Sequence, residues 1–336
     1  MAKARKKNNN VAKKEILQST KKYSLIQKAL GFAELCRPIE WTKSLLNMVL
    51  ATLIVYYVYI ISLGFGLQIS IGLFVAGFFS VAFLWSGLYT LNDYTDWRID
   101  ALHERKKFRP IPSGKVTPLQ GFSFSLLLIL ISIIIPLALG NFLLLICVLA
   151  MITNQLLYTT KPFRLKSRKI FDIISGGMVN PFFRYFSGIV LFVPAIVLVS
   201  NPIPILPIIF VIGMQFGGYS LYRMFSIKYD KKVKMKSSVA LVSPKKMQAI
   251  SYGVMGIGAL SYLGLLINGA TFRAEWLGYL PPQYIGAIII ALLFSPLLIG
   301  SIKNPQKADM KKSYRSLYIA NTAFIIGHLV IFFLFH

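Results

Sequence analysis

The sequence predicts an all-α protein that crosses a membrane many times, and three observations lead to this prediction. Hydrophobic residues make up 56% of the 336 residues, and the mean hydropathy is +0.64. A soluble protein of this composition would expose far more apolar surface than water tolerates. The apolar residues also gather in runs of about 20, which is the length that an α-helix needs to cross a bilayer.

About nine such runs follow one another along the chain, and they predict a polytopic helical bundle. They centre on 44–63, 70–91, 120–139, 142–160, 170–193, 205–226, 247–267, 284–302 and 317–335. The segment before them, residues 1–30, is rich in lysine, and its composition predicts a disordered cationic tail. Residues 31–336 then form a single transmembrane domain.

The net charge of +26 follows the predicted topology. With nine spans, the N-terminal tail and the basic loops 98–115, 161–169, 228–246 and 303–315 all lie on one side, whereas the loops on the other side contain one cation, Arg273. The positive-inside rule places the basic side in the cytoplasm of a multi-pass plasma membrane protein. The basic residues are then expected to contact anionic membrane lipids. Nothing interleaves aromatic with basic residues in a soluble domain, which argues against nucleic acid as a partner.

The most informative segment is NDYTDWRIDALHERKKFRPIPSG, residues 92–114, which closes the second apolar run. Asp93, Asp96 and Asp100 are spaced three and four residues apart, so one helix face can carry all three carboxylates. Carboxylates bind Mg²⁺, and the cations that follow, with Lys107 and Arg109 among them, bind phosphate. A charged loop beside a membrane helix is the alternative, but it does not explain why acids gather here in helical register. The segment therefore predicts a diphosphate site.

Polar residues inside the apolar runs predict a polar pocket within the bundle. An arginine inside a span costs several kcal/mol unless it faces a cavity or a partner, which makes Arg184 informative. Other polar residues in or near the spans are Lys43, Asn47, Asn154, Tyr158, Asn180, Tyr219, Tyr222 and Arg223. Simpler explanations are open for each kind. The asparagines could form interhelical hydrogen bonds, Arg184 could reach the membrane surface, and the tyrosines could belong to an interfacial belt. For Asp172, a helix-end charge is the default interpretation.

Several segments resemble the UbiA superfamily of intramembrane prenyltransferases. NDYTDWRID at 92–100 matches the NDxxDxxxD motif of that superfamily, and RPIPSG at 109–114 is similar to the sequence that follows it. YTTKPFRLK at 158–166 and YDKKVKMKSSVALVSPKK at 229–246 resemble two later segments. The resemblance covers nearly everything after residue 35. It implies a helical bundle around a central lipid-accessible cavity, capped by cytoplasmic loops.

The resemblance also implies Mg²⁺, a polyprenyl diphosphate donor or a polyprenyl phosphate lipid as partner, and a small-molecule acceptor. The catalytic residues would be Asp93, Asp96 and Asp100, and these would hold the metal together with Asn92. The candidate diphosphate ligands are Asn92, Lys107, Arg109, Tyr158, Lys161, Arg164 and Lys166. The candidate pocket residues are Lys43, Asn47, Asn154, Asn180, Arg184, Tyr219, Arg223 and Asp230.

The chain departs from the superfamily at its second acidic motif, DxxxD. Asp230 matches the last position of this motif, but Ser226 stands at the first. Some members that carry His and Lys before RPI, as here at His103 and Lys107, transfer 5-phosphoribose from its diphosphate to a polyprenyl phosphate. The sequence therefore predicts a Mg²⁺-dependent prenyltransferase that releases pyrophosphate. Phosphoribosyl transfer and a non-catalytic lipid-binding role are the two alternatives that it leaves open.

Overall fold

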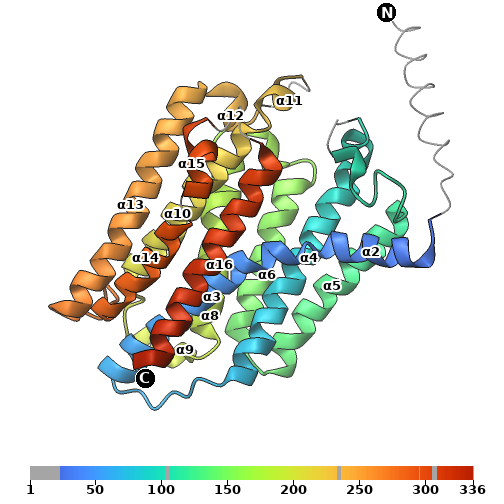
Figure 1. Cartoon of the computed structure of the whole chain (residues 1–336). Helices are drawn as coiled ribbons and strands as arrows, with labels where there is room; N and C mark the ends of the chain where they lie inside the picture. The colour runs from blue at the N-terminus through green and yellow to red at the C-terminus, as the bar shows by residue number, and fades with distance from the viewer. Residues whose placement is uncertain (1–22, 103–105, 233–235, 295, 305–308, 336) are drawn as a thin grey trace, which may run out of the picture. The chain divides into compact units, whose positions relative to one another are not determined.

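The computed structural model describes residues 23–102, 106–232, 236–294, 296–304 and 309–335. Every regular element in these residues is a helix, which confirms the predicted all-α class. Figure 1 shows these helices with their labels. His103 lies outside the described residues, as do the residues of the N-terminal tail up to 22.

Seven segments of the described chain are long and apolar enough to cross a membrane by length and composition. They are Leu25–Ser62, Ile71–Asp100, Pro118–Ala138, Phe142–Thr159, Ile205–Met224, Pro244–Ala270 and Lys312–Phe335. Each coincides with one of the predicted apolar runs, so the protein is a multi-pass integral membrane protein.

The predicted count of nine spans is not confirmed, because runs 170–193 and 284–302 are not among the seven segments. Run 170–193 contains α7 (Phe171–Ile174), the π-helix η5 (Ser175–Val179) and α8 (Asn180–Val190), which follow one another without a gap. Run 284–302 begins in η6 (Pro282–Tyr284) and contains α14 (Ile285–Leu293) and α15 (Pro296–Lys303). Pro181 and Pro296 lie in the first turn of α8 and α15, where a helix tolerates proline well.

Helix α2 spans Leu25–Cys36, so residues 25–30 of the segment that was predicted to be disordered are helical. Ser24 caps this helix. Its side chain accepts a hydrogen bond from the backbone of Gln27, and the side chain of Gln27 accepts one from the backbone of Ser24. Such a reciprocal capping box satisfies backbone donors that would otherwise lack partners at a helix start.

The chain divides into two compact units, each described by itself. Unit 1 consists of Met1–Pro38 and Trp85–Ile129, and unit 2 of Ile39–Leu84 and Leu130–His336. Helices α4 (Ile71–Asp100) and α5 (Pro118–Ala138) contribute residues to both. The buried core of unit 1 is formed by Leu35, Ile111 and Val116. Partly buried aromatic residues surround that core.

Unit 2 contains most of the helices. In chain order these include α3 (Trp41–Ile54), the π-helix η2 (Val55–Ser62), α6 (Phe142–Thr159), η4 (Leu165–Ser167), α9 (Ala195–Ser200), α10 (Ile205–Met224), α11 (Ile227–Lys232), α12 (Ser238–Leu241), α13 (Pro244–Ala270) and α16 (Met310–Phe335). Helices α10 and α13 lie side by side in Figure 1 and pack along much of their length.

Glycines allow the helices of unit 2 to approach closely. A Cβ atom at Gly213 of α10 would lie 2.7 Å from the Cα of Gly258 on α13. A Cβ at Gly188 of α8 would lie 2.6 Å from the Cβ of Ala51 on α3. Small residues at such contacts let backbones pack directly, and this packing drives helix association where lipid surrounds the bundle.

Candidate active site

The C-terminal end of α4 carries the predicted carboxylates into the interior of unit 1. Asp93 and Asp100 are seven residues apart, about two helical turns, and each is only 1% exposed. Asn92 and Asp96, on the same part of α4, are half-buried. A buried carboxylate without a partner is costly, so the partners of Asp93 and Asp100 decide what this cluster can do.

A single nitrogen of Arg109 joins the two buried carboxylates. Arg109 Nη1 donates to Oδ1 of Asp93 and to Oδ2 of Asp100, and both distances are 2.8 Å. The Lys106 ammonium lies 3.4 Å from Asp100 Oδ1 on the other side. The turn that carries Arg109 is fixed by its own backbone, since Ser113 N–H donates to the Arg109 carbonyl at 2.9 Å.

Arg37 completes this network, and the sequence did not predict its role. Arg37 Nη2 donates to Oδ1 and Oδ2 of Asp93, at 2.7 and 2.6 Å, and its guanidinium carbon lies 5.1 Å from the centre of the Tyr89 ring. No local pattern could have revealed it, because 56 residues separate Arg37 from Asp93. We call Arg37, Asp93, Asp100 and Arg109 the carboxylate–guanidinium network.

The C-terminal end of α2 holds Arg37 in place. Arg37 adopts a left-handed backbone conformation with φ of 48°, and Pro38 follows it. Two hydroxyl groups of α4 bind the last carbonyls of α2. Ser86 Oγ donates to the Cys36 carbonyl at 2.7 Å, and Thr90 Oγ1 donates to the Leu35 carbonyl at 3.3 Å. These bonds satisfy acceptors that a helix end otherwise leaves open.

The network fits a divalent cation that arrives with a diphosphate. Within the described residues, no three His, Cys, Asp or Glu side chains converge as a complete metal site. Mg²⁺, however, is commonly held by one or two carboxylates together with substrate phosphates and water. Asp93 and Asp100 already share one cationic nitrogen, which shows that their oxygens can converge on a single positive charge.

A second polar cluster lies in unit 2, around Arg223. Arg223 Nη2 donates to Asp230 Oδ2 at 2.8 Å and lies 3.9 Å from Asp172 Oδ2. Ser237 Oγ donates to the same oxygen of Asp230 at 2.7 Å. Asp230 is thus buried, and its carboxylate accepts hydrogen bonds from two side chains of the same unit. Sequence reasoning identified Arg223 and Asp230 but did not assign a role to Ser237.

Asp172 lies in the first turn of α7, as its interpretation as a helix-end charge predicts, and its buried carboxylate also accepts hydrogen bonds from α12. Ser238 donates to its carboxylate twice, from its backbone N–H at 3.1 Å and from its hydroxyl at 2.5 Å. The Ser238 hydroxyl in turn accepts a hydrogen bond from the Ile170 N–H at 2.7 Å. Asp172 lies in α7, outside the seven candidate spans. Burial raises the pKa of its carboxyl, while the Ser238 hydrogen bonds and Arg223 act in the opposite direction.

The predicted asparagines form hydrogen bonds between helices. Asn154 Nδ2 donates to Asn180 Oδ1 at 2.7 Å, which joins α6 to α8, and Ser175 Oγ donates to Asn154 Oδ1 at 3.0 Å. Asn47 donates to the Pro181 carbonyl at 3.3 Å and accepts a hydrogen bond from Gln215 at 2.5 Å. Sequence reasoning did not single out Gln215. These contacts match the interhelical role that was the alternative to ligand binding.

The other predicted residues occupy varied environments within the described structure. Tyr158 and Tyr219 share a hydrogen bond of 2.6 Å between their hydroxyl groups. Lys43 pairs with Glu40 at 2.6 Å, and Arg184 is buried in α8. Lys107 and Lys161 are exposed, and the Lys107 ammonium lies 5.1 Å from the centre of the Phe108 ring. Arg164 is half-buried and has a backbone φ of 40°. Lys166 is buried in η4. Their assignment as diphosphate or pocket residues stays a prediction.

Comparison with known proteins places this chemistry in a family. Residues 46–325 match the family model described as the UbiA prenyltransferase family. Protoheme IX farnesyltransferase of Thermoplasma volcanium is 28% identical over 258 residues, which cover 74% of this chain and 80% of the relative. The bacteriochlorophyll synthase 33 kDa chain of Rhodobacter capsulatus is 26% identical over 176 residues, which cover 52% of this chain and 57% of the relative.

A solved structure shows the same fold. It is a UbiA homolog from Archaeoglobus fulgidus bound to GPP and Mg²⁺, with a TM-score of 0.62 and 16% sequence identity. The match covers 90% of this chain and 99% of that chain. The family match spans most of the sequence, and two carboxylates of NDYTDWRID, Asp93 and Asp100, lie buried at the end of α4. The chain therefore belongs to the UbiA prenyltransferase family and is a membrane prenyltransferase of the UbiA type.

Proposed function

We propose that this protein transfers a prenyl group from a prenyl diphosphate to an acceptor and releases pyrophosphate, with Mg²⁺ bound at Asp93 and Asp100. The observation that carries the proposal is the carboxylate–guanidinium network of unit 1. It combines two buried carboxylates, which suit Mg²⁺, with two guanidinium groups, which suit phosphate. The Archaeoglobus homolog that binds GPP and Mg²⁺ supports this choice of ligands.

The side chains of the network change partners when the donor binds. A planar guanidinium binds phosphate with the same forked geometry that it uses for a carboxylate, so Arg37 and Arg109 turn from the aspartates to the diphosphate oxygens. Asp93 and Asp100 are then free to hold Mg²⁺, which when bound neutralises charge on the leaving group. The two guanidinium groups stabilise the same charge as the bond between C1 and oxygen breaks.

A tetrapyrrole is the first acceptor to test. One relative is named for farnesyl transfer to protoheme IX, and another is a bacteriochlorophyll synthase chain. The basic loops would face the cytoplasm, as the positive-inside rule predicts. Phosphoribosyl transfer is a second candidate, because Ser226 replaces an acid and the remaining acid, Asp230, is already bound to Arg223 and Ser237.

The experiment is a measurement of pyrophosphate release by the purified protein in detergent with Mg²⁺. One set of reactions contains farnesyl or geranylgeranyl diphosphate with a panel of acceptors that starts with protoheme IX. A second set contains phosphoribosyl diphosphate with a polyprenyl phosphate. Release with a prenyl donor, lost in Asp93→Asn, is the expected result. Release with the ribosyl donor alone would establish the second candidate, and silence in both sets would overturn the proposed activity.

A further inference from the structure

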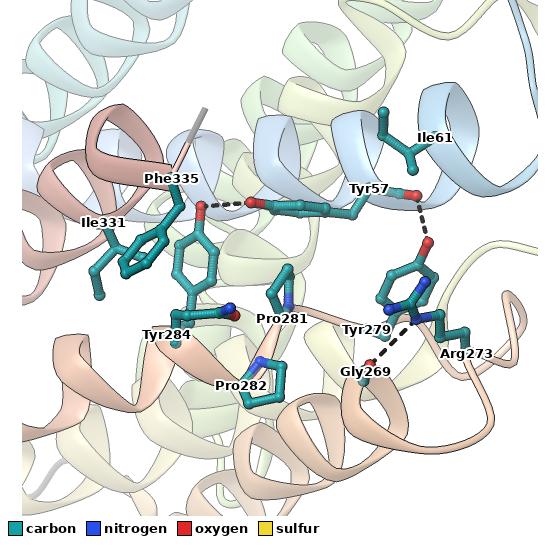
Figure 2. A pocket seen from close by; sticks show the side chains of 11 residues that line it. Tyr57, Ile61, Gly269, Arg273, Tyr279, Pro281, Pro282, Tyr284, Ile331 and Phe335 are labelled. Atoms are coloured by element: carbon teal, nitrogen blue, oxygen red, sulfur yellow. Dashed lines mark hydrogen bonds between the residues drawn. The ribbon is translucent and has the colours of Figure 1, made fainter.

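A pocket of about 310 Å³ lies in unit 2, at the end opposite the basic loops of that unit. Helix α13 begins at Pro244, within the predicted basic loop 228–246, and ends at Ala270 beside this pocket. Helix α16 begins at Met310, within the predicted basic loop 303–315, and ends at Phe335, which lines the pocket. Figure 2 shows the tyrosines, prolines and Arg273 around it.

Three tyrosines form a fixed wall of the pocket. Tyr279 OH donates to the Tyr57 carbonyl at 2.7 Å, and the hydroxyl groups of Tyr57 and Tyr284 share a hydrogen bond of 3.2 Å. A Cβ at Gly269 would lie 2.0 Å from the Leu280 carbonyl oxygen, so only glycine allows the loop to pack this closely against α13. The tyrosine hydroxyls are thus already bonded within the wall, and among the described residues that line the pocket Arg273 carries the one charge.

The loop after α13 holds Arg273 at the pocket. Arg273 has φ of 49°, an unfavourable conformation for a residue with a side chain. Its N–H donates to the Asn268 carbonyl at 2.8 Å. The buried side chain of Asn268 binds Ala274 and Gly278 through three hydrogen bonds of 2.9 to 3.0 Å. The turn is therefore fixed in the conformation that brings Arg273 to the pocket.

The Arg273 guanidinium is available to a ligand. It is exposed and, within the described residues, its recorded contact is a hydrogen bond of 3.4 Å from Nε to the Gly269 carbonyl. A guanidinium with open Nη groups is a donor for phosphate oxygens. Arg273 is also the single cation in the loops predicted on this side of the membrane, where topology disfavours arginine and lysine.

The surroundings of the pocket select an amphiphile rather than a soluble anion. Ile61 and Phe335, which line the pocket, and Phe272 and Trp276, which belong to the loop of Arg273, are large apolar side chains that are exposed. In an integral membrane protein such residues contact acyl chains and the interface, where aromatic residues are enriched. The positive charge of Arg273 also disfavours a headgroup that carries its own ammonium.

We propose that this pocket binds the phosphate of an anionic phospholipid from the leaflet opposite the basic loops. The phosphate binds Arg273, the headgroup enters beside Gln283, and an acyl chain lies along Ile61 and Phe335. This binding site is independent of prenyl transfer, so it stands or falls separately from the proposed function.

The test is site-specific photolabelling in nanodiscs of phosphatidylcholine. The probe is a trace of phosphatidylglycerol with a diazirine near its glycerol backbone, and labelled peptides are identified by mass spectrometry. Labelling of 271–284 should fall by up to about fivefold in Arg273→Gln, because an exposed charge pair contributes up to roughly 1 kcal/mol. Gln283→Trp fills the pocket without changing charge and should lower labelling similarly, while Lys303→Gln, at the other end of unit 2, should not.

Competition identifies the ligand. Unlabelled phosphatidylglycerol should displace the probe from 271–284, and added phosphatidylcholine or inorganic phosphate should not. Equal labelling in Arg273→Gln and the natural protein would overturn the proposal. Equal displacement of the probe by phosphatidylcholine would also overturn it, because the site would then not distinguish an anionic headgroup from a zwitterionic one. Displacement by inorganic phosphate would likewise overturn it, because the site would then be one for small anions.

Discussion

Arg37 and Arg109 bind one set of anionic groups in the structure and a second set in the proposed reaction. In the structure they neutralise Asp93 and Asp100, and in the proposed reaction they bind the diphosphate. If Asp93 and Asp100 bind Mg²⁺ as proposed, this exchange explains how the two carboxylates can be buried in a membrane protein without a large cost before the substrate binds. It also means that stability and activity respond differently to each substitution in the network.

Asp93→Asn should lower the rate of pyrophosphate release by about 100-fold or more, because Mg²⁺ and its charge stabilisation are lost. The stability cost should be only about 1–3 kcal/mol, because both guanidinium partners are a quarter exposed and retain water. The checks are the pyrophosphate assay and thermal unfolding followed by a dye that reacts with the buried thiol of Cys147.

Glu34→Gln is the matched control for this prediction. Glu34 also lies in unit 1 and pairs with a cation, Lys115 at 2.8 Å, but its side chain is 47% exposed. Both activity and unfolding temperature should stay near the natural values. Normal activity in Asp93→Asn would remove the metal assignment.

Arg37→Gln tests the residue that the sequence did not reveal. We expect kcat/KM for the prenyl diphosphate to fall about tenfold or more, since a charge-assisted hydrogen bond contributes roughly 1.5–3 kcal/mol. Arg98→Gln removes the same charge from α4, where Arg98 is exposed beside the ring of Trp97. Equal kinetic loss in the two variants would indicate a general effect of charge and would argue against a specific role for Arg37.

At the scale of elements, two kinds of contact hold the helices of unit 2 together. Direct backbone contact joins α10 to α13 at Gly213 and Gly258. Buried polar contacts join α12 to α7 through Ser238 and Asp172. Ser237, which immediately precedes α12, donates to Asp230 of α11, and Asp230 in turn pairs with Arg223 of α10.

Gly213→Ala should lower the unfolding free energy by about 1–3 kcal/mol, because its methyl group would overlap the backbone of α13. Gly256→Ala, on α13, is the control, since in the described part of the chain no atom beyond the adjacent residues and the helix's own nearby backbone lies within 4 Å of the added carbon. The control should be neutral or slightly stabilising, because alanine favours a helix over glycine. Thermal unfolding of both variants provides the comparison, and equal effects would contradict close packing at Gly213.

Ser238→Ala should destabilise the protein by about 1–3 kcal/mol, because a buried oxygen of Asp172 loses its donor. Ser226→Ala is a suitable control, since the recorded hydrogen bonds of Ser226 are made by its backbone. The same thiol-dye unfolding assay measures both. A larger effect in Ser226→Ala would show that the incomplete second motif has a structural role that these contacts do not describe.

At the scale of the whole molecule, Mg²⁺ should be required for turnover and not for folding. The described residues are held by helix packing and by ion pairs between their own side chains. Addition of EDTA should therefore abolish pyrophosphate release and leave the helical circular dichroism signal unchanged. Restored release after excess Mg²⁺ completes the measurement, and loss of helical signal would instead indicate a structural metal.

Local patterns predicted the features that depend on local physics. Hydropathy predicted the membrane helices, and the spacing of Asp93 and Asp100 predicted their shared helix face. Hydropathy did not predict the π-helical segment in run 170–193, because composition alone does not reveal that the helix changes to the π form at Ser175. Nor could it predict the partners of Arg37 or Asp172, whose contacts join residues 56 and 66 positions apart.

The ion pair between Arg37 and Asp93 also has a consequence for biogenesis. Arg37 leaves the ribosome 56 residues before its partner, so the first apolar segment enters the translocon while this guanidinium still needs another counterion. Its charge is neutralised within the protein once the second segment has followed. A ribosome-bound chain that stops before Asp93 should therefore insert its first segment in a looser arrangement than one that extends through Asp100.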